Sequence, residues 1–438
     1  MDYRSVAEQI FLAGVDRVLP DRLINKSISV DDDLLAIGQH HFNLKAFENI
    51  YIIGAGKASA LMGAEVERIL AGRITDGHIV VKYGHSCRLK KIKVTEAGHP
   101  VPDSNSFAAT RSILEIAAIA GNKDLVICLL SGGGSALLSD CPAGISQEEM
   151  AGFNSLMVNS GASIGEINTL RKHLSGVKGG QLARAVYPAT LVSLILSDVI
   201  GDPLDVIASG PTVADPTTFS QALEILRKYS LENSVLPGII SHLTAGEQGL
   251  ITETPKSKDP VFYRAFNLLV GNNKLALEAA VERASELNIN ALIMDDRLEG
   301  EVNFVSEYIV EAALKYKHDN KIAKPVCLLF GGEPTVRVTG KGEGGRNQHL
   351  ALCCSTLLKN QKGITILSAG TDGNDGPTPA AGAVVDCDTC NNAMAQNISP
   401  DEYLAEFDSF NFFRKAGGHI ITGPTMTNVM DIIVVIIS

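Results

Sequence analysis

The chain has 438 residues and a formal net charge of −11. The length predicts two or three domains, of which we favour two, and the negative charge without any Lys/Arg block argues against a nucleic-acid-binding protein. No apolar run reaches the ~18–20 residues that a membrane-spanning helix needs, so we expect a cytoplasmic protein whose partners are small molecules and which could form homo-oligomers.

The first elements are a helix and a strand–turn–helix unit. An amphipathic pattern over residues 6–18 predicts a helix that stops at Pro20, rather than a secretion signal. Residues 49–53 predict a strand that enters the turn Gly54-Ala-Gly56-Lys57-Ala-Ser59, which resembles the dinucleotide fingerprint GxGxxG with a serine as its last residue. The strand over 78–81 ends in Lys82-Tyr-Gly, where an NAD site would carry an acidic residue for the ribose, so an NAD site is disfavoured.

Lys57 is the candidate ligand-binding residue of this turn. Its ammonium would lie near a helix N-terminus, where both the charge and the helix dipole attract phosphate. A lysine on the surface is the alternative interpretation. The turn-rich segment 98–103 follows, and His99 within it either serves in a site or makes a structural hydrogen bond.

The strongest signal for a ligand site lies at residues 125–135. Residues 125–130 are six consecutive apolar residues, typical of a strand that is buried on both faces in a parallel sheet. A glycine-rich loop follows, whose backbone N–H groups could cradle an anion: Ser131, Gly132, Gly133, Gly134 and Ser135. The alternative is a tight turn without a ligand. Ordering three glycines has an entropic cost of roughly 0.5–1 kcal/mol each, which disfavours this alternative.

Four polar residues further along are candidates for an anion pocket or for proton transfer. A capping box at Ser163 predicts a helix with Asn168 and Arg171 away from its apolar face, and Lys178 follows in a turn. These side chains could line an anion pocket or a solvated surface. A buried strand over 191–196 leads to Asp198, a candidate general base or magnesium ligand, with a turn-capping aspartate as the alternative.

The polar, proline-bearing stretch 248–260 predicts a linker between an amino-terminal domain, residues 1–247, and a carboxyl-terminal domain, residues 248–438. We expect both to be α/β domains with largely parallel sheets covered by helices. In the second domain, Arg346 and Asn347 begin a predicted helix. Asp372 and Asp375 lie in a glycine-rich loop after the predicted strand 364–367 and are candidate metal ligands.

Taken together, the motifs resemble the glycerate 2-kinase family, whose carboxyl half is called the MOFRL domain. The resemblance spans nearly the whole chain and depends on the order of the motifs, at residues 54–59, 98–103, 131–136, 168–175, 178–180, 197–202, 344–347 and 370–376. The chain departs from the family pattern at Met426, where many relatives have glycine, and at Glu301-Val302, which lacks the usual following Ala-Arg pair.

The resemblance implies a two-domain α/β enzyme with a cleft between its domains. Such an enzyme uses ATP and a divalent metal, Mg²⁺, to phosphorylate the 2-hydroxyl of D-glycerate, giving 2-phosphoglycerate. Lys57, Asp198 and Arg346 would be catalytic, and Asp372 and Asp375 would bind the metal. The implied residues for binding substrate or nucleotide are Gly54, Gly56, Ser131, Gly132, Gly133, Gly134, Ser135, Asn168, Arg171, Lys178 and Asn347.

Two other functions stay open at this stage. Some relatives bear the label hydroxypyruvate reductase, which makes an NAD(P)H-dependent oxidoreductase the second candidate, although the missing ribose acid argues against it. A non-catalytic protein that binds sugar acids or nucleotides is the third. The coexistence of cationic and acidic candidates favours the kinase over this binding protein.

Overall fold

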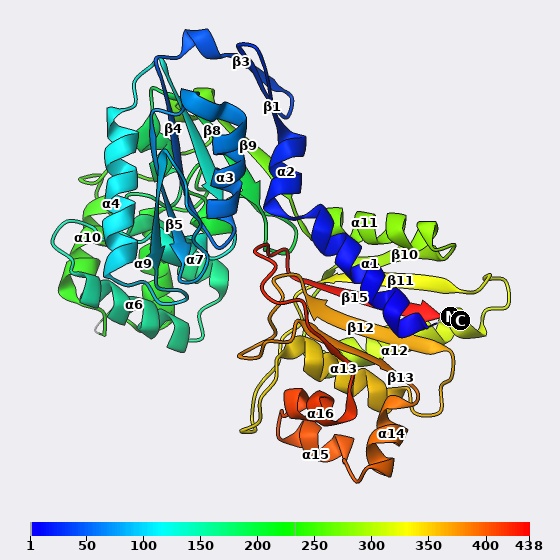
Figure 1. Cartoon of the computed structure of the whole chain (residues 1–438). Helices are drawn as coiled ribbons and strands as arrows, with labels where there is room; N and C mark the ends of the chain where they lie inside the picture. The colour runs from blue at the N-terminus through cyan, green and yellow to red at the C-terminus, as the bar shows by residue number, and fades with distance from the viewer. Residues whose placement is uncertain (1, 233) are drawn as a thin grey trace. The chain divides into compact units, whose positions relative to one another are not determined.

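The computed structural model describes residues 2–232 and 234–438, which form two compact units. The amino-terminal unit is Leu23–Val270, and the carboxyl-terminal unit combines Met1–Arg22 with Gly271–Ser438. Each unit contains a six-stranded sheet with helices packed on it, as Figure 1 shows. The predicted α/β fold with two domains is therefore confirmed.

The sheet of the amino-terminal unit is parallel through β6-β5-β4-β7-β8, and β9 lies next to β8 at its edge. Every residue of β7 and β8 is buried, as expected for strands covered on both faces. The strands are β4 (Asn49–Ala55), β5 (Asp76–Lys82), β6 (Ile92–Ala97), β7 (Asp124–Leu130), β8 (Thr190–Leu196) and β9 (Ala265–Gly271).

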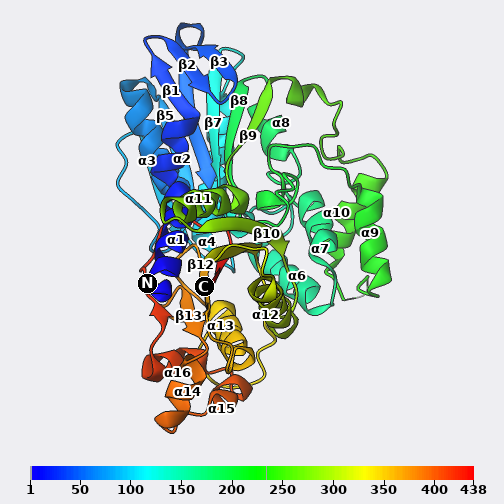
Figure 2. The ribbon, with the colours of Figure 1, turned by 90° about the vertical axis from the view of Figure 1, so that its right-hand side faces the viewer.

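Helices cover both faces of this sheet. Figure 1 shows α3 (Ser59–Leu70) and α4 (Ser104–Ile119) on opposite sides, and α4 shares its apolar core with α8 (Gln181–Val186). Four more helices pack around a separate apolar cluster beside the sheet, grouped in Figure 2: α6 (Gln147–Asn159), α7 (Ile164–His173), α9 (Phe219–Lys228) and α10 (Pro237–Glu247).

The smaller elements of the amino-terminal unit are helices and a three-stranded antiparallel sheet. They are α2 (Pro20–Ser27), β1 (Ile28–Asp31), β2 (Leu34–Ile37), β3 (His40–Asn43), α5 (Gly134–Leu137) and the 3-10 helices η1 (Leu44–Ala46), η2 (Ala71–Arg73), η3 (Ile207–Ser209) and η4 (Pro260–Arg264).

The sheet of the carboxyl-terminal unit is mixed, which differs from the largely parallel sheet that we expected there. Its order is β10-β11-β15-β12-β13-β14, and the carboxyl-terminal strand β15 runs antiparallel between β11 and β12. Among the described strands of this sheet, only β10 and β11 are parallel neighbours. The strands are β10 (Asn290–Leu298), β11 (Val326–Gly332), β12 (Ile364–Gly370), β13 (Gly382–Asp386), β14 (His419–Ile420) and β15 (Asp431–Ile437).

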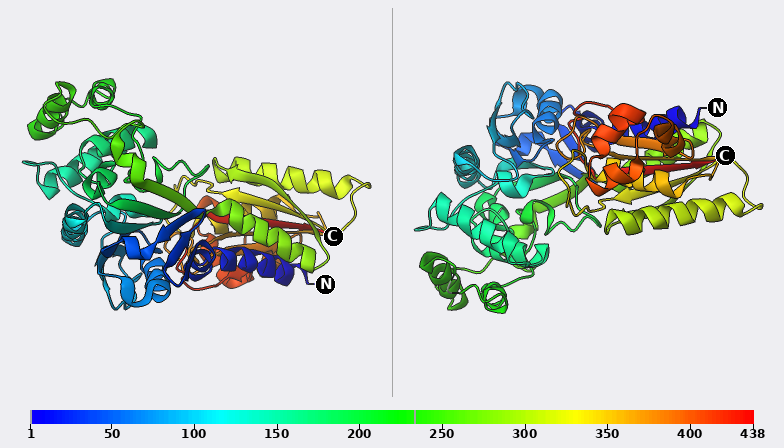
Figure 3. Two further views of the ribbon diagram at one scale, coloured as in Figure 1. Left: turned by 90° about the horizontal axis from the view of Figure 1, so that it is seen from above. Right: turned by 90° about the horizontal axis from the view of Figure 1, so that it is seen from below.

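Alternate residues of β15 serve two apolar layers. Ile433, Val435 and Ile437 face the core built with α12 and α13, whereas Ile432 reaches Gly14 of α1 on the other face. Figure 3 shows α1 and α11 side by side. The helices are α1 (Tyr3–Arg17), α11 (Asn273–Glu286), α12 (Val302–His318), α13 (Arg346–Leu357), α14 (Thr389–Ala395), α15 (Pro400–Ala405) and α16 (Ser409–Ala416).

The boundary between the units lies elsewhere than the predicted linker 248–260. That stretch packs on the amino-terminal unit, where the buried Thr254 hydroxyl donates a hydrogen bond of 3.0 Å to Asp215. The chain then adds β9 to the first sheet before it enters the second unit. In addition, α1 belongs to the carboxyl-terminal unit because it buries Ile10 and Phe11 there. Within the described residues, no helix combines the length and the apolar character needed to cross a bilayer.

Candidate functional site

The loops that carry the sequence candidates of the amino-terminal unit meet at the carboxyl edge of its sheet. The strand order places β5 on one side of β4 and β7 on the other, so the chain reverses direction across the sheet between β4 and β7. Open α/β sheets bind ligands at such a switch point. Lys57 follows β4, the glycine loop follows β7, and Asp198 follows β8.

The turn after β4 is joined to the glycine loop by backbone hydrogen bonds. The N–H of Lys57 donates to the Gly132 carbonyl at 2.9 Å, and the N–H of Ala58 donates to Ser131 Oγ at 3.0 Å. These two N–H groups and the Ser131 hydroxyl therefore serve the fold. Gly56 has φ +136°, and a Cβ there would lie 2.1 Å from Ser131 Oγ, so close packing explains this glycine.

Gly54 has an equally structural reason. It lies inside β4, where a Cβ would come within 2.3 Å of the Leu129 carbonyl oxygen of the neighbouring strand β7. Gly54 and Gly56 thus shape the sheet edge, and neither lines the pocket described below. The GxGxxG-like pattern, which by itself suggested nucleotide contacts, here allows two segments of main chain to approach each other.

In the glycine loop, two glycines leave room for polar side chains from other segments. A Cβ on Gly132 would lie 2.0 Å from Asp198 Oδ2. A Cβ on Gly133, which has φ +84°, would lie 2.9 Å from the His99 ring. Gly132, Gly133 and Ser135 each contribute a backbone N–H group to the same loop. The loop therefore carries a carboxylate, an imidazole and N–H donors side by side.

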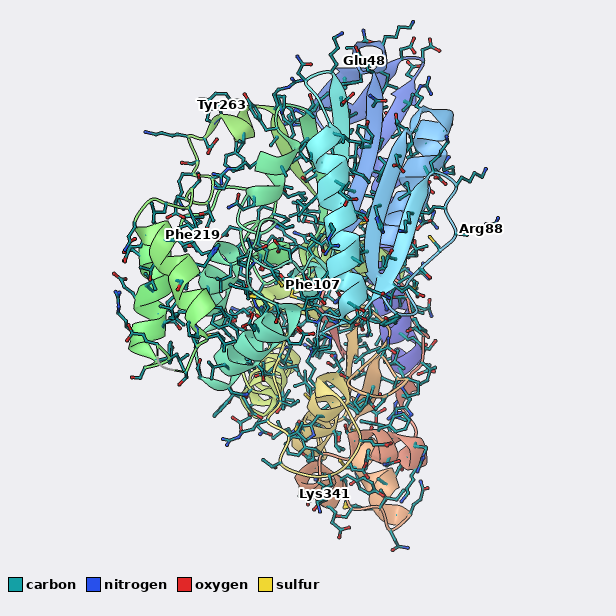
Figure 4. The ribbon with its side chains drawn as sticks, turned by 90° about the vertical axis from the view of Figure 1, so that its left-hand side faces the viewer. Glu48, Arg88, Phe107, Phe219, Tyr263 and Lys341 are labelled. Carbon is teal, nitrogen blue, oxygen red and sulfur yellow. The ribbon has the colours of Figure 1, made fainter. Side chains whose placement is uncertain are left out.

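A pocket of about 760 Å³ opens beside this loop, within the amino-terminal unit. Its volume falls in the range of about 300–1,000 Å³ that is typical of small-molecule sites. Phe107, labelled in Figure 4, contributes to the apolar part of its wall from α4. Of the sequence candidates, the pocket is lined by His99, Gly133, Gly134, Ser135, Asn168, Arg171, Lys178 and Asp198. The structure thus brings together residues from five separate motifs.

Two cations line the pocket from α7 and the turn after it. Arg171 Nε donates to Asn154 Oδ1 at 3.1 Å, which orients the guanidinium. Lys178 is only 6% exposed, and its ammonium donates to the Leu138 carbonyl. Burial lowers the pKa of Lys178 to about 8, against the opposing influence of Asp140. An ammonium that has lost most of its hydration gains strongly from an anionic ligand.

A tight turn at residues 208–210 completes the wall. Ala208 and Ser209 have φ of +51° and +60°, a left-handed conformation that is unfavourable for non-glycine residues. Hydrogen bonds from Gly179 N and Gly180 N to the carbonyls of Ser209 and Gly210 hold this turn, at 2.9 and 2.8 Å. Ser209 Oγ lies 2.9 Å from Ser135 Oγ and 3.4 Å from Asn168 Oδ1. The turn therefore fixes two of the predicted binding residues.

Arg346 lies in the carboxyl-terminal unit, at the start of α13, where carboxylates surround it. Its Nε and Nη2 donate to the fully buried Asp431 at 2.5 and 3.0 Å, and Nη1 donates to Glu333 Oε1 at 2.8 Å. This bidentate geometry orients the guanidinium, whose side chain remains 32% exposed. Asp431 was missed by sequence reasoning because it reads there as the first residue of an apolar strand.

Asp375 caps the same helix. Its two carboxylate oxygens accept hydrogen bonds from the N–H groups of Asn347 and Gln348, at 3.0 and 2.8 Å. Burial raises the pKa of Asp375 to about 6 despite these donors. The candidate Asn347 is buried too, and its Oδ1 accepts from Ser368 Oγ at 2.7 Å. These contacts indicate structural roles for both residues.

Asp372 also has a local hydrogen bond, since its Oδ1 accepts from the N–H of Asn374 at 3.1 Å. Within the part of the chain that the structure describes, no group of three or more His, Cys, Asp or Glu side chains is arranged to hold a metal ion. Asp372 and Asp375 therefore do not form a metal site built by the protein alone, and their role as ligands of Mg²⁺ together with substrate phosphates stays a prediction.

Comparison with known proteins agrees with this architecture. Residues 6–244 match the family described as a domain of unknown function, DUF4147, and residues 326–431 match the MOFRL family. A D-glycerate 2-kinase from Thermotoga maritima is 40% identical over 434 residues, which cover 98% of this chain and 97% of the relative. The chain belongs to the glycerate 2-kinase family. Members named in this way are phosphotransferases, so the chain is an enzyme of that class.

Two further comparisons extend this result. The crystal structure of a glycerate kinase from Thermotoga maritima has a TM-score of 0.88 at 38% identity, covering 100% of this chain and 99% of that chain. A protein of Agrobacterium vitis, whose name assigns it provisionally as a hydroxypyruvate reductase, is 40% identical over 389 residues, or 88% of this chain and 86% of the relative. Both names therefore occur among relatives of this chain.

One departure from the family pattern has a structural counterpart. Met426 adopts φ +62°, in the left-handed region that glycine enters without steric cost. The backbone shape that suits glycine is thus kept with a methionine in its place.

Proposed function

We propose that this enzyme transfers the γ-phosphoryl group of ATP to the 2-hydroxyl of D-glycerate, giving 2-phosphoglycerate. The observation that carries the proposal is the pocket of the amino-terminal unit, where Asp198 lies against the glycine loop and two cations line the wall. A kinase for a small acid needs these parts: a proton acceptor, cations for the carboxylate, and donors for phosphoryl oxygens.

Asp198 is the proposed general base. Its carboxylate adjoins Gly132, at the loop where the reacting oxygen would lie, and it would accept the proton of the 2-hydroxyl as that oxygen attacks phosphorus. Arg171 and Lys178 would hold the carboxylate of glycerate, since both are cationic and line the same pocket. In this arrangement the 2-hydroxyl of the substrate lies at the carboxylate of Asp198, and the substrate's own carboxylate lies at Arg171 and Lys178.

The phosphoryl group would bind at the backbone of the glycine loop, residues 131–135. The N–H groups of Gly132, Gly133 and Ser135 and the ammonium of Lys57 would oppose the charge on its oxygens, which is the main contribution that proteins make to phosphoryl transfer. We include Arg346 in this proposal because the family resemblance covers both units. Its pairs with Asp431 and Glu333 orient it and leave N–H donors for a phosphate.

The proposal includes Mg²⁺ only as the companion of the nucleotide. Mg²⁺ usually keeps several waters and binds one or two carboxylates together with substrate phosphates. The carboxyl-terminal loop does not provide a complete protein site, because Asp375 caps α13. We therefore assign no step of the reaction to a metal that this loop would hold.

The test is product analysis with purified full-length enzyme. D-glycerate with ATP and Mg²⁺ should give 2-phosphoglycerate by phosphorus NMR, with one ADP formed per product. A parallel reaction with hydroxypyruvate and NADH or NADPH addresses the reductase, and we expect no oxidation of either cofactor because β5 ends in Lys82 rather than an acidic residue. Formation of 3-phosphoglycerate, or NAD(P)H oxidation without ATP consumption, would overturn the proposal.

A further inference from the structure

His99 is a pocket residue that the proposed reaction has not used. It lies between β6 and α4, lines the pocket, and rests its ring on Gly133, one residue from the glycine that adjoins Asp198. Its ring makes no hydrogen bond to another residue of the described chain. Nearby histidines differ in this respect, since His78 bonds to Thr95 and His85 bonds to the Lys57 carbonyl.

The surroundings of His99 keep its imidazole uncharged. Burial, together with the positive charges of Lys57, Lys82 and His85, lowers the pKa of His99 to about 4. A neutral imidazole offers one N–H donor and one nitrogen acceptor. It suits a hydroxyl group, which also donates and accepts, better than a carboxylate or phosphate, which requires cations or several donors.

The three polar groups of D-glycerate are its carboxylate, its 2-hydroxyl and its 3-hydroxyl. In the proposed function, on which this inference rests, the cations take the carboxylate and Asp198 takes the 2-hydroxyl. Two neutral side chains of the pocket, Ser135 and Asn168, are already engaged with Ser209. We propose that His99 hydrogen-bonds the 3-hydroxyl of the substrate and thereby selects acids that carry this second hydroxyl.

The test compares D-glycerate with D-lactate, which has the same carboxylate and 2-hydroxyl but a methyl group in place of the hydroxymethyl. Dissociation constants of both acids are measured by titration calorimetry on the full-length enzyme with a non-hydrolysable ATP analogue. We expect wild-type enzyme to prefer D-glycerate by about tenfold or more, the effect of one hydrogen bond in a desolvated site. In His99→Phe this ratio should fall to within about threefold because only D-glycerate binding weakens.

Two further variants complete the design. His99→Gln keeps a neutral donor and acceptor, so it should retain part of the preference and decide the question if His99→Phe does not fold. His41→Gln, on the exposed strand β3, should leave both dissociation constants unchanged. A wild-type enzyme that binds both acids equally, or a folded His99→Phe in which the preference is unchanged or both acids weaken alike, would overturn the inference. Failure of the proposed function itself would appear instead as no 2-phosphoglycerate from wild-type enzyme.

Discussion

At the scale of single residues, burial changes what a charged side chain can do. Lys172 and Lys178 are both buried, at 3% and 6% exposure. Lys172 pairs with Asp205 and with the buried Asp215, at 3.3 Å from each, and so completes an ion network inside the unit. Lys178 instead lines the pocket, and its lowered pKa shows that burial outweighs the nearby Asp140. Lys172 therefore has a structural role, whereas Lys178 is placed to bind an anionic ligand in the pocket.

The titration of Lys178 gives a prediction for pH dependence. Below its pKa of about 8 the ammonium is charged and can bind the carboxylate of D-glycerate. Above that pH the charged fraction falls, so the KM for D-glycerate should rise, by up to about tenfold per pH unit. Lys178→Met should have a high KM at every pH. The measurement is KM at saturating Mg²⁺ and ATP across this range, and a wild-type KM that stays flat through pH 8 would contradict the assignment.

At the scale of elements, the glycine loop after β7 acts as a spacer. Its glycines matter because Asp198 and His99 occupy the places that Cβ atoms would take. The same loop is held by hydrogen bonds to the turn after β4, so its main chain has little freedom to move. A methyl group added there must therefore displace a side chain of the site rather than the loop.

Gly132→Ala tests this spacer role. The added methyl would lie 2.0 Å from Asp198 Oδ2, so the carboxylate must turn away and kcat should fall by about 100-fold, as in Asp198→Asn. The variant should still unfold cooperatively, because the displaced atom is at the end of a side chain. The matched control is Gly165→Ala on α7, where no atom lies within 4 Å of the new Cβ. Wild-type kcat in Gly132→Ala or in Asp198→Asn would remove Asp198 from catalysis.

At the scale of the whole molecule, the proposal gives a catalytic role to Arg346 because the family resemblance covers both units. Arg346 belongs to the carboxyl-terminal unit, and its bidentate pair with buried Asp431 gives it a structural role in any case. Its catalytic role therefore has to be separated from its contribution to stability.

Arg346→Lys provides this separation. Lysine keeps the charge but loses the planar fork, so we expect kcat to fall by about 100-fold or more, together with a lower Tm. Arg297→Lys, an exposed arginine of the same unit that lies beside Asp296, is the control and should change neither quantity. Activity is measured below the Tm of the variant, with folding checked by circular dichroism. A folded Arg346→Lys enzyme with wild-type kcat would leave Arg346 as a purely structural residue.

Local patterns predicted the elements of the site well. The apolar run 125–130 lies in strand β7, the capping box at Ser163 begins α7, and Arg346 begins α13. Local patterns failed where partners are distant in sequence. Residues 248–260 look like a linker but pack on the amino-terminal unit, and α1 joins a unit that otherwise begins at Gly271, because burial of apolar surface decided these contacts.

The sequence by itself determined the α/β class, the ordered motifs of the family and the loops that follow β4, β7 and β8, since periodicity and turn residues are local properties. The tertiary structure alone decided what individual residues do. Gly54 and Gly56 allow close packing of the main chain, and Asp375 caps α13. Asp431 pairs with Arg346, and the ring of His99 packs on Gly133, next to the glycine that adjoins Asp198. The physical reason is that contact and burial depend on residues far apart in the chain, which no local pattern contains.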